Sequence, residues 1–154
     1  MLGQVDEAVL IDEVKTKVNA RKVLSKYRSM ARTAGISFGL QSPVLSDMPK
    51  GPSHHDSLEK SIIKKIDAEQ NCAEILAVLD LLPNKEAAIL KYSYCMPDKY
   101  TMNEIAAKVP GQRVNEFGEM EEFHYSVKNI ERLKSIALLS FAEGYRGGEL
   151  IAWE

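Results

Sequence analysis

The sequence has few of the residues that usually build catalytic or metal sites. Its 154 residues include two cysteines and three histidines. Neither Cys72 nor Cys95 has a second cysteine or a histidine at metal-ligand spacing. The adjacent His54 and His55 lie in a Gly/Pro/Ser-rich stretch without spaced carboxylates, which is a poor setting for a metal. We also find no phosphate-binding glycine loop, nucleophile elbow or paired carboxylates. The sequence therefore predicts a protein that is not an enzyme, has no cofactor or metal, and keeps both cysteines as reduced core thiols.

Long hydrophobic runs are missing as well. The apolar stretches at 87–90 and 136–139 are far too short to cross a bilayer. The N-terminal region reaches the acidic pair Asp6 and Glu7 before any basic run, which is not typical of a secretion signal. We therefore expect no membrane contact and a cytoplasmic location.

The net charge of −2 argues against a general polyanion binder, because nonspecific DNA affinity comes mainly from clustered cations. The local charge is nevertheless polarised. Residues 14–34 contain seven bases and no acid. Six of these bases are candidates for contacts with DNA phosphates or with RNA polymerase, namely Lys15, Arg21, Lys22, Lys26, Arg28 and Arg32. The alternative is a solvated helix that pairs with acidic residues of a partner protein.

Helical periodicity dominates the chain, and it predicts an all-α fold. We expect one helix over 6–34 that ends at Gly35, a second over 58–82 with Ser57 as its cap, and a third over 85–95. Residues 1–57 would form a basic helix and an extended arm, and residues 58–154 a helical DNA-binding domain. A small hairpin within 113–125 is the one place where strands could form.

The arm at 35–57 holds three glycines and three prolines and has no sustained period. It is more apolar than a free linker needs to be. We therefore expect it to pack against the 58–82 helix through Phe38, Leu40, Val44, Leu45 and Met48.

A pair of helices at 101–109 and 126–141 is typical of a helix-turn-helix. The second helix has Ser126 as its cap and an apolar stripe through Ile130 and Phe141. In such motifs the second helix presents its N-terminal residues to the major groove. The candidate DNA-binding residues are Ser126, Lys128, Asn129, Arg132 and Lys134. The alternative is an ordinary solvated face on the last helix of a bundle.

The interval at 110–125 is longer than the turn of about 3–4 residues that usually joins such helices. We therefore expect an insertion in the turn. It contains the acidic residues Glu116, Glu119, Glu121 and Glu122. Because these charges would repel a polyanion, we expect a small wing or loop turned away from the duplex.

Several segments together resemble one family. They are 27–51, with its Ser-Pro-x-x-Ser-Asp-Met-Pro string at 42–49, the short string 66–70, and the closing Ala-Leu-x-x-Phe-Ala-x-x-Tyr at 137–145. These strings resemble the ArpU family of phage transcriptional regulators over about 23–145. The resemblance implies a helical protein whose C-terminal part is similar to the promoter-reading region of a sigma factor, with Glu104, Ile105 and Ala106 in the first motif helix.

By that resemblance the chain would activate late phage genes for packaging, structure and lysis in a bacterial host cell. Its partners would be double-stranded DNA at a late promoter and host RNA polymerase, and it would act as a monomer or homodimer. One alternative is a DNA-packaging component similar to a small terminase subunit, which would form a ring. Another is a helical protein-interaction module that binds no DNA.

Overall fold

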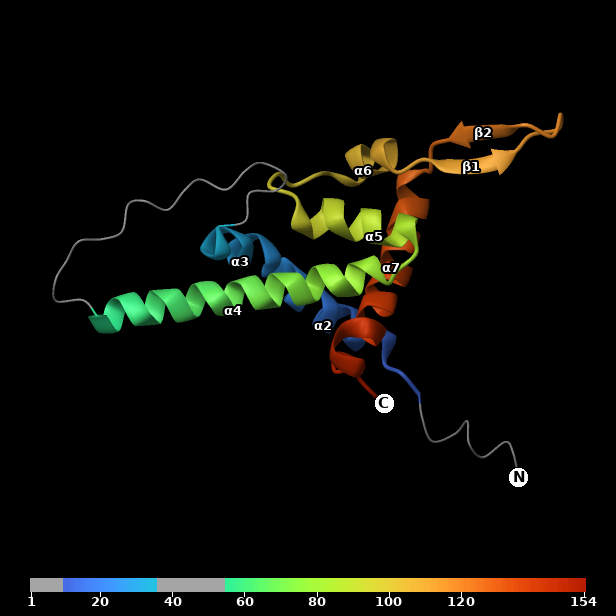
Figure 1. The fold of residues 1–154 in the computed structure, drawn as a ribbon. Coiled ribbons are helices and arrows are strands. Elements are labelled where there is room, and N and C mark those ends of the chain that lie inside the picture. The colour runs from blue at the N-terminus through green and yellow to red at the C-terminus, as the bar shows by residue number, and fades with distance from the viewer. Residues whose placement is uncertain (1–9, 36–54) are drawn as a thin grey trace, which may run out of the picture.

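The computed structural model describes residues 10–35 and 55–154. Figure 1 shows a mostly helical molecule in which the long helix α4 (His55–Asp80) crosses α7 (Val127–Gly144). The expected contact of the arm with α4 involves residues 36–54, so it lies outside the described residues. Within the described ranges, no helix combines the length and the apolar character that crossing a membrane requires.

The N-terminal basic segment forms two helices, α2 (Glu13–Ser25) and α3 (Tyr27–Ala34). Asp12 caps α2, and its Oδ1 accepts a hydrogen bond from Lys15 N at 3.1 Å. The chain turns at Lys26, so the single helix predicted over this region is wrong there. Gly35 ends α3 as predicted, because its φ of 77° is the left-handed conformation that glycine adopts without a steric penalty.

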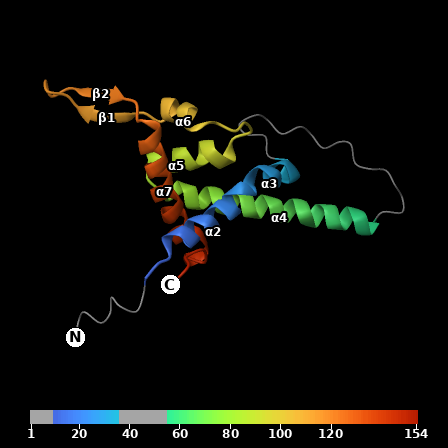
Figure 2. The same cartoon turned by 180° about the vertical axis from the view of Figure 1, so that it is seen from behind.

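A large core joins the N-terminal helices to the rest of the molecule. Leu24 and Tyr27 pack with Ile75 of α4 and with Leu138 and Phe141 of α7. Figure 2 shows α2 lying against α7 and α3 lying beside α4. This core draws on residues from both sides of the expected domain boundary at residue 57, and the boundary itself stays a prediction.

Backbone hydrogen bonds tie the two ends of the described chain together. Asp12 N donates to Ala152 O at 2.9 Å, and Glu154 N donates to Leu10 O at the same distance. The buried Thr16 hydroxyl accepts a hydrogen bond from Ala152 N at 2.9 Å. These contacts hold the start of α2 against the C-terminal segment.

The middle of the chain adds α5 (Asn84–Leu90), the π-helix η1 (Lys91–Cys95) and α6 (Met102–Lys108). Arg28 of α3 donates from Nε to Met96 O at 2.6 Å and from Nη2 to Ser93 O at 3.1 Å. Cys72 and Cys95 are both buried and free. Burial raises the pKa of the Cys95 thiol to about 12, which keeps the sulfur protonated and unreactive.

The all-α prediction is wrong, because the chain between α6 and α7 forms two strands. Strands β1 (Gly111–Val114) and β2 (Met120–Phe123) pair antiparallel, with Val114 opposite Met120. The Asn115 side chain organises the turn by accepting hydrogen bonds from Phe117 N and Glu119 N, both at 2.9 Å. A hairpin therefore stands where the sequence predicts a turn with an insertion, and the predicted helix-turn-helix domain is not confirmed. The sequence allows a small hairpin within 113–125, and a hairpin does form, although its first strand begins earlier, at Gly111.

Candidate nucleic-acid interface

The start of α7 is fixed by its own cap and by a neighbouring tyrosine. Ser126 Oγ accepts a hydrogen bond from Asn129 N at 3.2 Å, so the predicted N-cap is confirmed. Just before it, Tyr125 packs edge-on against Phe123, with ring centroids 5.0 Å apart. Lys85 Nζ of α5 donates a hydrogen bond to Tyr125 Oη at 2.7 Å. The first turn of α7 is therefore held from the hairpin and from α5.

A second, smaller core sets the position of α6 against α7. Ile105 and Ala106 of α6 pack with Ile130 of α7 and Ile89 of α5, and all four are buried. A capping box starts α6, because Thr101 Oγ1 accepts from Glu104 N at 3.2 Å and Glu104 Oε1 accepts from Thr101 N at 2.8 Å. Glu104 is therefore engaged in the cap of its own helix.

Three of the five predicted DNA-binding residues share one exposed face of α7. Lys128, Asn129 and Arg132 are all exposed, and spacings of three and four residues place them on the same side of the helix. Among the described residues, the side chains of Lys128 and Arg132 form no ion pair. Two cations and an amide are therefore presented to solvent within the first two turns of a capped helix.

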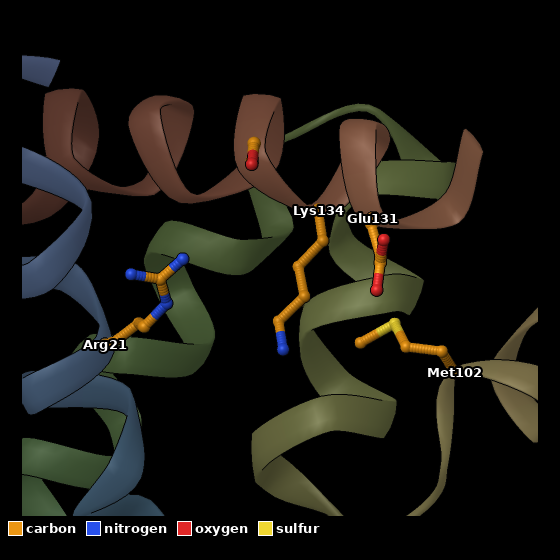
Figure 3. Close-up of a pocket in the computed structure, with 5 residues that line it drawn as sticks. Arg21, Met102, Glu131 and Lys134 are labelled. Carbon is orange, nitrogen blue, oxygen red and sulfur yellow. The ribbon is translucent and has the colours of Figure 1, made fainter. Parts of the chain in front are cut away.

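Lys134 lies on a different side of α7. At about 100° per residue it falls beside Ile130 and Ala137 rather than beside Lys128. Its Nζ is 4.9 Å from the centroid of the Tyr94 ring, and it lines a pocket of about 260 Å³ with Arg21 and Glu131. Figure 3 shows Lys134 and Arg21 entering this pocket from different helices. Burial, and then the positive charge of Arg21, lower the pKa of Lys134.

The six N-terminal candidates do not act as one surface. The Arg28 guanidinium donates hydrogen bonds to the carbonyl oxygens of Ser93 and Met96, so this side chain stabilises the packing of α3 against η1. Arg21 faces the pocket that Lys134 lines. The remaining four are exposed on α2 and α3 and at the turn between them, namely Lys15, Lys22, Lys26 and Arg32. Because α2 packs on the half of α7 that contains Ala137 and Phe141, these four side chains lie away from the start of α7.

Two lysines near the start of α7 do not stand out in the sequence. Lys85 is bonded to Tyr125, and Lys108 at the end of α6 lies 5.3 Å from the Tyr100 ring centroid. Lys85 precedes Tyr125 by 40 positions, so no local pattern connects the two residues. Both lysines are exposed and add positive charge to the region where α5, α6 and α7 meet.

The comparisons identify a regulatory relative. The chain is 37% identical over 145 residues to a protein of Enterococcus hirae named "Putative autolysin regulatory protein ArpU". The match covers 94% of this chain and 96% of the relative. No protein-family model matches the chain, and no solved structure matches it.

Proposed function

The chain belongs to the ArpU family, and from that premise we propose that it is a transcriptional regulator that binds DNA through the start of α7. It would activate late phage genes together with host RNA polymerase, in the cytoplasm of the bacterial host and as a monomer or homodimer. The name of the relative supports regulation, and the word autolysin in that name supports lysis genes as targets. We call the exposed face formed by Lys128, Asn129 and Arg132 the reading face.

The reading face is the observation that carries this proposal. It lies at the N-terminal end of an 18-residue helix whose opposite side is buried in both cores. A helix fixed in this way can present side chains to the major groove without rearranging. The partial positive charge at the start of a helix also favours the approach of phosphates.

Each side chain of the reading face has a distinct part in this proposal. Arg132 can donate two hydrogen bonds to guanine, and Asn129 can pair bidentately with adenine. Lys128 and the flanking Lys85 and Lys108 would contact phosphates, which fix the orientation of the protein without reading sequence. Lys134 is excluded from base reading, because it lies on the side of α7 that faces α2 and η1.

The test has two steps with the same purified protein. The first identifies the DNA sequence that the protein binds, and the second measures its affinity for that sequence. Fragments of phage and host genomic DNA would be selected on the purified chain, and the enriched sequence would be used in gel shifts at two salt concentrations. The double variant Lys128→Ala/Arg132→Ala should weaken binding and flatten its salt dependence, with a loss of about 1–3 kcal/mol for a base-reading arginine.

The matched control is Lys60→Ala/Lys64→Ala on α4. It removes the same two charges at the same four-residue spacing, from exposed positions outside the reading face. The control should bind nearly as well as the unaltered chain. Equal losses in the two double variants would mean that only net charge matters, and no loss in either would exclude the reading face as a DNA-binding surface.

A further inference from the structure

The end of the hairpin presents three apolar side chains to solvent. Val114 and Met120 form a cross-strand pair, and their exposed fractions are 63% and 64%. Phe117 in the turn between the strands is 79% exposed. We call these three residues the hairpin tip. Figure 1 shows the hairpin extending away from the helices, so the tip is accessible.

Hydrogen bonds order the backbone of the turn around Phe117. Two backbone hydrogen bonds to Asn115 Oδ1 fix the turn, and Asn115 N donates to Glu119 O at 2.8 Å. Gly118 adopts a φ of 78°, which lets the chain reverse at this point. The aromatic ring is therefore offered to solvent from an ordered backbone, and its docking would cost little additional backbone entropy.

The base of the hairpin is ordered by contacts between its two strands and with Tyr125, which lies just before α7. Arg113 pairs with Glu121 at 3.1 Å, and its guanidinium lies 5.1 Å from the Phe123 ring centroid. Gly111 is buried beneath the rings of Phe123 and Tyr125. The ordered base of the hairpin therefore ends at Tyr125, directly before Ser126, the N-cap of α7.

The tip is surrounded by negative charge. Within the part of the chain that the structure describes, no basic side chain pairs with Glu116, Glu119 or Glu122. These charges oppose contact with DNA phosphates. They also oppose contact between two copies through their tips, because Glu116 and Glu119 of one copy would meet the same residues of the other.

We propose that the hairpin tip docks into an apolar pocket bordered by lysine and arginine side chains on a second protein. Aromatic side chains are enriched at the centres of protein interfaces, and the acidic residues around this one favour a basic partner by charge complementarity. This inference rests on the proposed function in one respect. The docked protein would be the one through which the DNA-bound regulator changes transcription.

The experiment measures three quantities in a bacterial strain that carries the gene. They are occupancy of DNA by chromatin immunoprecipitation, the levels of the transcripts that depend on the gene, and photocrosslinking through p-benzoyl-phenylalanine placed at position 117. The variants are Phe117→Ala and Glu116→Lys/Glu119→Lys. The control is Leu81→Ala, which removes an apolar side chain of similar exposure, 77%, from the turn after α4.

Both tip variants should keep the melting temperature and the DNA occupancy of the unaltered chain. Both should lose transcript control, because truncating an aromatic anchor weakens docking by roughly tenfold or more. The crosslink should map to an apolar peptide flanked by lysine or arginine, and the charge-reversal variant should abolish it. Leu81→Ala should change none of these quantities.

Three results would overturn the inference. The first is a loss of DNA occupancy in Phe117→Ala, which would place the tip on the duplex. The second is a crosslink to another copy of the chain, and the third is unchanged transcript control in both tip variants. If the unaltered chain occupies no DNA, the proposed function fails, and the charge-dependent crosslink still decides whether the tip docks on a basic protein.

Discussion

The ammonium group of Lys134 lies over the ring of Tyr94, with Nζ 4.9 Å from the ring centroid. This contact joins α7 to η1 and holds the lysine on the side of α7 away from Lys128 and Arg132. A cation in that position is stabilised by the face of the ring. The Lys134 ammonium group would therefore not contact a DNA duplex that is bound at the reading face.

The substitution Lys134→Met should therefore leave DNA affinity close to that of the unaltered chain. Methionine keeps the apolar stem over Tyr94 and removes the charge. Gel shifts would compare this variant with Arg132→Ala, which should lose about 1–3 kcal/mol. If the two variants lost equal affinity, Lys134 would belong to the DNA contact, and the side of α7 that faces the duplex would have to be reassigned.

Helix α7 shows which side-chain positions can be predicted from the sequence and which cannot. Ser126 is predictable as a cap because the capping preference depends on the residue and its immediate neighbours. The outward position of Lys128, Asn129 and Arg132 follows from helical spacing. Lys134 is harder to place, because its charge suggests a DNA contact while its angle on the helix does not, and its neighbour Arg21 is remote in the sequence.

The helix break at Lys26 and the hairpin are difficult to predict from the sequence for other physical reasons. The break at Lys26 has no local marker, since neither glycine nor proline interrupts residues 13–34. It is set by packing, with Leu24 and Tyr27 buried on either side of it. The hairpin is only weakly indicated, because Val114 and Met120 are exposed and give no inside-outside alternation.

Substitutions at Ser126 separate its capping role from a contact with phosphate. Ser126→Ala should destabilise the protein by about 1 kcal/mol, because Asn129 N loses its acceptor. Ser126→Asp should restore stability, since aspartate is an equally good cap, yet weaken DNA binding by placing a negative charge beside the duplex. Urea unfolding and gel shifts would measure the two effects. Unchanged DNA binding in Ser126→Asp would show that no phosphate approaches this position.

The close packing at the hairpin base predicts that Gly111→Ala is poorly tolerated. A methyl group there would overlap the Phe123 ring and lie 2.8 Å from Tyr125 Cζ. We expect a destabilisation of about 1–3 kcal/mol, which is typical of overpacking. The control is Gly118→Asn, because asparagine accepts the left-handed conformation and open space surrounds this position. Similar thermal stability of Gly111→Ala and the unaltered chain would mean that the Phe123 and Tyr125 rings shift to accept the methyl group.

The Glu74–Arg146 pair predicts how stability responds to acid. Arg146 donates from Nε to Glu74 Oε2 at 2.9 Å and from Nη2 to Oε1 at 3.0 Å, which links the segment after α7 to α4. The hydrogen bonds from Arg146 lower the pKa of Glu74 in the folded protein. The unfolded value is about 4.3, so the ionised carboxylate stabilises the fold above that pH. This stabilisation is lost as the pH falls through the lower folded pKa.

The substitution Glu74→Gln should remove that pH-dependent part. Thermal unfolding from about pH 7 to about pH 3 should show the unaltered chain more stable than the variant near neutrality, with the difference shrinking in acid. The difference in stability should be small, because the pair is partly exposed to solvent and therefore screened. Glu149→Gln is the matched control, since its contact with Arg146 is longer, at 3.7 Å. A gap between the unaltered chain and Glu74→Gln that stayed constant down to about pH 3 would show that Glu74 acts through packing rather than through its charge.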